Sequence, residues 1–265
     1  MKILALGTSC VDVYPQKNIV TPGGEALNIA VHLSLREDAQ VYLMGLIGND
    51  HYADTILESI RNYKIDKTHL YQITGETANH VIHINKEGDR YFEEGAWNGG
   101  VSADFRINKD DKNLLSNIDG AITTLWEPNL KELLKMKQEK EYLVAVDFND
   151  QRNFTSWEDL IDDIDIFFSS AEESMKEVFK ERSKNSDTIF VLTFGEQGSV
   201  AYHKGFAYQS PAVEVEKVID TTGCGDCYQG HFLTEYIKTG NIQDSMNKAT
   251  VEAAKVTAYV GGFPV

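Results

Sequence analysis

Short hydrophobic runs alternate with longer amphipathic segments along most of the chain. The hydrophobic runs have the length of buried strands, and between them apolar residues recur at helical spacing. Near-continuous apolar strands that alternate with helices are typical of a parallel sheet covered by helices on both faces. The expected strands are Ile3–Leu6, Val41–Leu46, Ala121–Leu125, Tyr142–Val146, Ile166–Phe168 and Ile189–Thr193, and the expected helices are Ala26–Leu35, Tyr52–Tyr63, Leu130–Lys137, Glu172–Arg182, Asp226–Lys238 and Ile242–Tyr259.

Two regions depart from this alternation. Val11–Val20 is polar and reads as extended, and Thr77–Phe92 is expected to form a hairpin with a turn at residues 86–89. The two pieces could pair into a small sheet that covers an active site and excludes water, although an ordinary edge hairpin would give the same pattern. We therefore expect one α/β doubly wound domain spanning residues 1–265, with a lid formed from about residues 11–22 and 76–98.

Composition limits the partners of the protein. The 265 residues include 25 Lys and Arg against 41 Asp and Glu, a formal net charge of −16, which disfavours binding to nucleic acid. The first apolar run is too short to cross a membrane, and Asp12 interrupts it before a signal-peptide cleavage region. A chain with only 3 cysteines is expected to occupy a reducing compartment, and we expect a cytoplasmic location.

Candidate chemistry is concentrated in the stretch from Asp220 to Asp226, directly before an expected helix. Gly223 and Gly225 flank Cys224, so the backbone can turn tightly and bring its amides against a ligand. The unpaired N–H groups of a helix N-terminus attract anions, phosphate in particular. Asp226 is placed to accept a proton from a hydroxyl that attacks a phosphate. The stretch indicates phosphoryl transfer to an alcohol, and the alternative is an ordinary turn with a helix-capping Asp.

Cys224 and Cys227 have the spacing of a redox pair or of half a zinc site. The sequence has no second Cys-x-x-Cys and no nearby histidine pair to complete a metal set, so the two cysteines are expected to be small filling residues. A thiol at a helix N-terminus can also have a lowered pKa, which would make it sensitive to oxidation.

The spacing Asp-Thr-x-Gly-x-Gly-Asp resembles a signature of the ribokinase-like (PfkB) carbohydrate kinases, and the resemblance extends over nearly the whole chain. It implies a ribokinase-like fold, ATP and Mg²⁺ as cofactors and a small sugar or amino-sugar as substrate. Because the lid of this family often contributes to a dimer, a homodimer through the lid is a further expectation.

The sugar-binding end of the family is also matched. By this resemblance Asp12, Gly23, Gly24 and Asn28 contact the acceptor, and the Asn28 amide can both donate and accept hydrogen bonds. The sequence departs from the family at Glu37, where glycine or serine is expected, and at His231, where glycine is common.

For the nucleotide, the resemblance points to Thr193, Gly195 and Gly198, which follow an expected strand. A hairpin turn explains these glycines equally well, and the chain has no P-loop motif. Thr250 and Gly261 are expected to face the adenine pocket.

The family element Asn-x-x-Glu, which organises magnesium and phosphate, aligns with residues 170–173. Glu173 matches the acid and is expected to hold the metal through water. Ser170 replaces the asparagine, which leaves the metal environment open.

Within the family the chain is most similar to kinases that phosphorylate an amino-ketose formed from glucose and lysine, in its segments 7–16, 22–24, 89–92, 100–105 and 146–150. Arg90 could bind the carboxylate of such a substrate, and Trp97 could stack on a sugar or a cation, unless both belong to a solvated hairpin. The alternatives are a ribose, fructose or nucleoside kinase, a nucleotide-binding protein without catalysis, and a redox or metal protein.

Overall fold

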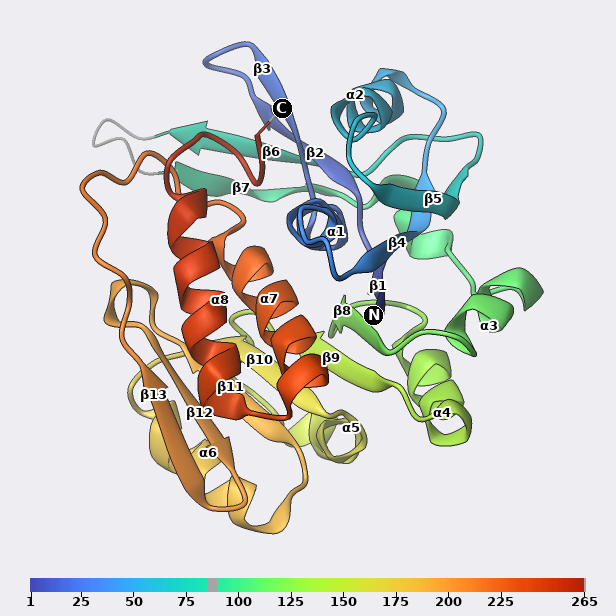
Figure 1. The fold of residues 1–265 in the computed structure, drawn as a ribbon. Coiled ribbons are helices and arrows are strands. Elements are labelled where there is room, and N and C mark those ends of the chain that lie inside the picture. The colour runs from blue at the N-terminus through green and yellow to red at the C-terminus, as the bar shows by residue number, and fades with distance from the viewer. Residues whose placement is uncertain (85–89, 265) are drawn as a thin grey trace.

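The central element of the molecule is a large, mostly parallel sheet (Figure 1). The computed structural model describes residues 1–84 and 90–264, without the side chains of residues 84–94 and 155. Within these residues the sheet has nine strands in the order β13-β12-β11-β10-β9-β8-β1-β4-β5, of which β12 and β13 are antiparallel to their neighbours. The strands are β1 Lys2–Leu6, β4 Gln40–Ile47, β5 Ile65–Gln72, β8 Gly120–Thr124, β9 Leu143–Asp147, β10 Ile166–Ser170, β11 Ile189–Thr193, β12 Ser199–His203 and β13 Phe206–Ser210.

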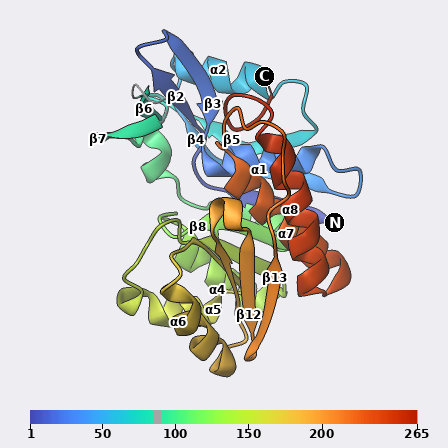
Figure 2. The same ribbon diagram turned by 90° about the vertical axis from the view of Figure 1, so that its left-hand side faces the viewer.

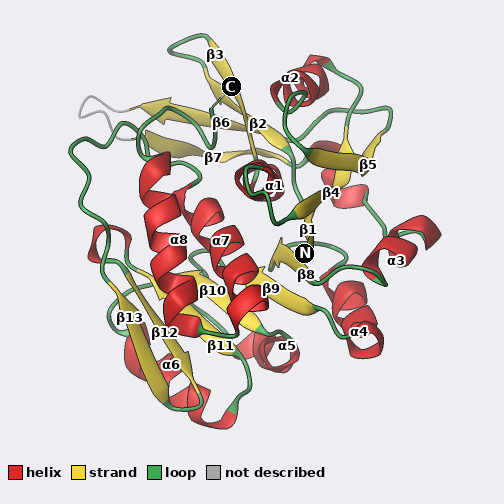
Figure 3. Cartoon of the chain, viewed as in Figure 1, coloured by secondary structure: helices red, strands yellow, loops and turns green. Residues whose placement is uncertain are grey.

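Both faces of this sheet are covered by helices (Figures 2 and 3). Alternate residues of a strand point to opposite faces, and in β1 Ile3 and Ala5 belong to one hydrophobic cluster while Leu4 and Leu6 belong to another. The first cluster packs against α1, α2, α7 and α8, and the second against α3, α4, α5 and α6. The helices are α1 Glu25–Ser34, α2 His51–Ser59, α3 Lys109–Leu115, α4 Leu130–Lys140, α5 Glu158–Asp163, α6 Met175–Arg182, α7 Cys224–Thr239 and α8 Ile242–Val256.

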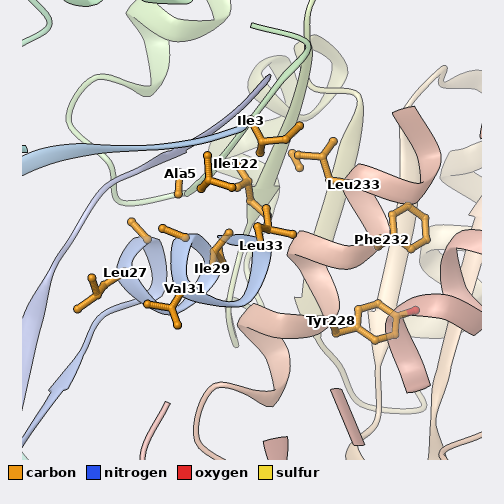
Figure 4. Packing of buried hydrophobic residues seen from close by; sticks show 14 of the residues in the cluster. Ile3, Ala5, Leu27, Ile29, Val31, Leu33, Ile122, Tyr228, Phe232 and Leu233 are labelled. Atoms are coloured by element: carbon orange, nitrogen blue, oxygen red, sulfur yellow. The ribbon is translucent and has the colours of Figure 1, made fainter. Parts of the chain in front are cut away.

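Helix α7 is anchored against α1 and the sheet. Figure 4 shows Leu233 of α7 beside Ile3 of β1, with Tyr228 and Phe232 along the same helix, and all four side chains are buried. Gly230 allows α1 to approach, because a Cβ at this position would lie 3.2 Å from Cγ of Leu33. The start of α7 is therefore held in a fixed position relative to the sheet.

A second, smaller sheet is separate from the large one and lies at the top of the view in Figure 1. Within the described residues it has four strands in the order β3-β2-β6-β7, namely β2 Cys10–Tyr14, β3 Ile19–Gly23, β6 Asn79–Ile84 and β7 Arg90–Asn98. The two pieces that were expected to pair do so, through parallel contacts between β2 and β6. The fold class is thus confirmed: a mostly parallel sheet with helices on both faces and a small second sheet.

Several boundaries differ from the expected ones. The helix expected from Glu172 begins at Met175, and the helix expected to reach Tyr259 ends at Val256. Strands β5, β12 and β13 were not expected: β5 and β13 lie at the two edges of the sheet and have partly exposed residues, whereas β12 is mostly buried but has a polar residue at each end of its short apolar run. No helix in the described ranges is long and apolar enough to span a membrane.

Candidate active site

The N-terminus of α7 is the centre of the candidate site. The helix begins at Cys224, slightly earlier than expected, and Gly223 precedes it in the left-handed region with φ 79°. A Cβ at Gly223 would lie 2.5 Å from the carbonyl oxygen of Gly262, so this turn requires glycine. Within the described chain no side chain caps the helix, and its first N–H groups, together with the helix dipole, are suited to an anion.

Space is available beside this terminus. A Cβ built on Gly225 would meet no atom within 4 Å in the described structure. Gly225 therefore lines open space and does not pack against a neighbour. Its backbone can come close to a ligand that sits over the helix terminus.

Asp226 lies at the same point, in the first turn of α7. Its Oδ2 accepts a hydrogen bond of 2.7 Å from Nδ2 of Asn28, which is buried in α1. The Oδ1 atom of Asn28 is buried without a hydrogen-bond partner among the described residues and faces Gly262. The structure thus brings Asp226 and Asn28 into direct contact, although they are far apart in the sequence.

Asp12 belongs to this group as well. It lies on β2, its charge raises the pKa of Asp226, and its Oδ2 would be 2.9 Å from a Cβ at Gly23. At Gly24 (φ 100°) a Cβ would lie 2.5 Å from the carbonyl oxygen of Thr8. The two glycines therefore allow β3 and the start of α1 to pass close to Asp12 and to the loop after β1.

Two more acids, Asp147 and Glu25, lie near Asp12 and Asp226, and the sequence analysis did not select them. Nε2 of Gln229 donates to Oδ2 of Asp147 at 2.7 Å, and the amide nitrogen of Asn149 donates to Oδ1 of Asp147 at 2.8 Å. The side chain of Asn149 also donates to Glu25 of α1. The available signal was the position of Asp147 at the carboxyl end of a buried strand, where ligands bind in open α/β sheets.

The negative charges of these acids raise one another's pKa values. Burial, together with the charges of Asp147 and Asp12, raises the pKa of Asp226 to about 7, although the hydrogen bond from Asn28 lowers it. Burial also raises the pKa of Glu25, with added contributions from Asp147 and Asp226. A carboxyl group that titrates near neutral pH is suited to general-base catalysis.

Three of the residues predicted for the nucleotide, Thr193, Gly195 and Gly198, lie between the end of β11 and the start of β12, and a fourth, Thr250, lies on α8. Thr193 ends β11 and is in register with Ser170 of β10. Gly195 has φ 57° and a Cβ there would meet open space, whereas a Cβ on Gly198 would collide with the carbonyl oxygen of Ser210. Oγ1 of Thr250 and Oγ of Ser210 are 2.9 Å apart. Gly198 and Thr250 therefore both lie next to Ser210.

Gly261 lies elsewhere. Its amide nitrogen donates to Oδ2 of Asp220 at 2.9 Å, and a Cβ at Gly261 would be 4.0 Å from Cβ of Thr21 on β3. The structure thus places Gly261 between the start of the Asp220–Asp226 stretch and the small sheet. Its assignment to the adenine pocket stays a prediction.

Glu173 is exposed and its Oε1 lies 2.7 Å from Nζ of Lys176. In the described ranges no three His, Cys, Asp or Glu residues are arranged to hold a metal ion. Mg²⁺ commonly keeps several waters and binds through one or two carboxylates and the phosphates of a nucleotide, so the assignment of Glu173 stays a prediction. Nη1 of Arg152, which the sequence analysis did not select, donates to the carbonyl oxygen of Ser170 at 2.9 Å.

Three more residues from the sequence analysis remain to be placed: Arg90, Cys227 and His231. Arg90 begins β7, but its side chain is outside the described part of the structure. The expectation of a lowered thiol pKa is wrong for Cys227, because burial raises its pKa well above the usual range. His231 is buried, with Nδ1 3.3 Å from Nη1 of Arg36, and burial lowers its pKa to about 4.

Comparison with known structures identifies the fold. An adenosine kinase from Sinorhizobium meliloti matches with a TM-score of 0.85 and 18% identity, over 100% of this chain and 96% of that one. A ribokinase from Arabidopsis thaliana, complexed with ribose and ATP, matches with a TM-score of 0.84 and 16% identity, over 99% and 95%. The fold is therefore that of the ribokinase-like kinases.

Sequence comparison gives the family. The model of the pfkB family of carbohydrate kinases matches residues 6–263, and the chain belongs to this family. It is 30% identical to fructoselysine 6-kinase of Shigella flexneri, over 99% of this chain and 100% of that protein. It is 26% identical to fructosamine kinase FrlD of Bacillus subtilis, over 99% and 93%. The protein is thus a carbohydrate kinase, a phosphotransferase that acts on small sugar molecules.

Proposed function

We propose that the protein transfers the γ-phosphate of ATP to the 6-hydroxyl of fructoselysine or a related fructosamine. The two similar kinases are named for fructoselysine and for fructosamine, and each aligns with nearly the whole chain. Both names support a fructosamine as the substrate. The observation that carries the proposal is the position of Asp226. This carboxyl group is held by Asn28 beside an uncapped helix terminus, and burial raises its pKa to about 7.

In the proposed mechanism, bound ATP supplies the phosphoryl group. Asp12, Gly23, Gly24 and Asn28 orient the acceptor, and Asp226 takes the proton of the attacking hydroxyl. The amides of residues 223–226 and the dipole of α7 stabilise the negative charge that spreads over the transferred group. Because the small sheet carries Asp12, whose charge acts on Asp226, we propose that this sheet is the lid that excludes water.

We propose that Thr193, Gly195, Gly198, Thr250 and Gly261 contact the nucleotide. Gly195 borders open space at the end of β11, which supports a backbone contact there. Glu173 would hold Mg²⁺ through water, and this ion would neutralise part of the phosphate charge. Glu173 is exposed, so its ion pair with Lys176 is weak enough to be exchanged for the metal.

The test is an ADP-release assay over four groups of acceptors: fructoselysine, other fructosamines, simple ketoses, and nucleosides. We expect the highest kcat/KM with fructoselysine or another fructosamine and a product phosphorylated at the 6-position. A preference for ribose, fructose or a nucleoside would contradict the substrate and favour the second candidate function. The resemblance to a ribokinase from Lactococcus lactis, 25% identical over 90% of this chain and 80% of that protein, supports that alternative.

Two further expectations accompany this function. A homodimer formed through the small sheet is expected from the family, and sedimentation of the purified protein measures it. A cytoplasmic location is expected because ATP and a reduced thiol environment are found there.

A further inference from the structure

We propose that Trp97, supported by His80, is the specificity-determining residue that binds the amino substituent of the acceptor. This inference rests on the proposed function and refines it. Asp226 and its neighbours act at the hydroxyl end of the substrate. The part of a fructosamine that carries the amine must bind elsewhere, and the small sheet offers a surface for it.

The strand register places a row of residues across the small sheet. Asp12 of β2 pairs with Thr21 of β3 on one side and with His80 of β6 on the other, and His80 pairs with Trp97 of β7. Residues that are directly paired in neighbouring strands project from the same face of a sheet. Thr21, Asp12, His80 and Trp97 therefore share one face.

That face is turned toward the candidate active site. The charge of Asp12 acts on Asp226, and its carboxylate lies against Gly23 near the start of α1. Thr21, at one end of the row, approaches Gly261 in the C-terminal segment. Trp97 is two strands away from Asp12, a separation of about 10 Å at the usual strand spacing. A substrate whose hydroxyl reaches Asp226 can extend along the row to Trp97.

Trp97 is a large aromatic residue with 48% of its surface exposed. Its ring meets the ring of His80 edge to face, with centroids 5.5 Å apart and an interplanar angle of 71°. This contact supports the indole on one side and leaves much of it available to a ligand. An indole face attracts ammonium groups more strongly than any other aromatic side chain.

His80 does not oppose a cation at this place. Burial lowers the pKa of His80, so the imidazole is neutral at neutral pH. The nearest charged member of the row is Asp12, whose carboxylate favours a cation. A protonated amine is therefore compatible with this surface, and an unsubstituted ketose has no ammonium group for the indole to attract.

The test compares Trp97→Ala with the wild type on two acceptors, fructoselysine and fructose. We expect KM for fructoselysine to rise about 2- to 30-fold, with kcat little changed, because a cation–π contact is lost. KM for fructose should stay within the error of the measurement. Trp97→Phe, which keeps an aromatic face, should recover part of the affinity for fructoselysine.

Trp126→Ala is the matched control. Trp126 is 62% exposed and packs edge to face on Trp157, in a different part of the molecule from the small sheet. It should change neither KM. Equal changes for both acceptors in Trp97→Ala, or no change, would overturn this inference alone. A wild-type enzyme that phosphorylates fructose but not fructoselysine would overturn both this inference and the proposed substrate.

Discussion

The carboxyl group of Asp226 is buried among other acids, and its chemistry depends on this environment. In water an aspartate is fully ionised at neutral pH, whereas here burial brings its pKa to about 7. A base works only when it is unprotonated. The pH dependence of the reaction therefore reports directly on this residue.

We predict that kcat/KM rises with pH through about 7 and then levels off. Asp226→Asn should lower kcat by about 10²–10⁴-fold or more, because the general base is lost, while nucleotide affinity changes little. Initial rates between pH 5.5 and 9 and a nucleotide titration measure both effects. Asp187→Asn, at an exposed acid, is the control. Normal turnover by the Asp226 variant would show that the assigned base is wrong.

Asp147 is a positioning residue in this scheme. It ties the end of β9 to Gln229 of α7 and raises the pKa of Asp226 through its charge. Asp147→Asn keeps an oxygen that can accept from Gln229 but removes the charge. The rise of kcat/KM should therefore shift to lower pH, with kcat at pH 8 largely retained. An unchanged pH profile would contradict this influence.

At the scale of elements, the start of α7 combines two glycines with different functions. Gly223 has a positive φ and touches Gly262, whereas Gly225 lies in the helix and faces open space. The first glycine is required by the backbone. The second is required only if a ligand occupies the space beside it.

Substitution by alanine separates these functions. Gly223→Ala should destabilise the protein by at least about 1–2 kcal/mol, because a left-handed residue gains a Cβ. Gly225→Ala should leave the melting temperature unchanged or slightly higher, since alanine favours helices. We expect it to lower kcat/KM for ATP at least about tenfold by blocking the phosphates. Thermal melts and steady-state kinetics measure the pair, and full activity of Gly225→Ala would exclude a phosphate contact at that position.

At the scale of the whole molecule, carboxyl groups from distant segments converge. Asp12 lies on β2, Glu25 on α1, Asp147 on β9 and Asp226 on α7, and only folding brings them together. The folded protein therefore binds protons more readily than the unfolded chain. Such a cluster costs stability when it ionises, and it is retained where a function requires it.

This cost should be measurable. The pKa of Asp226 is about 7 in the folded state and about 3.9 in the unfolded chain. The protonated carboxyl group therefore favours the folded state below about pH 4, and this contribution to the free energy of unfolding is lost as pH rises from about 4 through 7. In Asp226→Asn the side chain cannot ionise, so this loss of stability does not occur. We expect it to melt a few degrees above the wild type at pH 8, and the difference to shrink toward pH 4. A difference in melting temperature that does not vary with pH would show that the pKa of Asp226 is not raised in the folded protein.

Much of the architecture could be predicted from the chain alone. The central strands β1, β4, β8, β9, β10 and β11 are continuous apolar runs because both faces of a parallel sheet are buried. The edge strands β5 and β13 were missed, since their partly exposed residues interrupt that signal, and β12 was missed because polar residues at both of its ends leave only a short apolar run. Helix ends were misplaced where polar first turns precede the buried residues, as at Met175.

The sequence by itself determined the fold class and the stretch Asp220–Asp226, because hydrophobic periodicity and glycine spacing are local properties of the chain. It did not reveal the hydrogen bond between Asn28 and Asp226, the contribution of Asp147 and Glu25, or the row from Thr21 to Trp97. Those depend on strand order and register, which bring together residues far apart in sequence. Only the tertiary structure decides such contacts, and with them the pKa of the candidate base and the surface offered to the substrate.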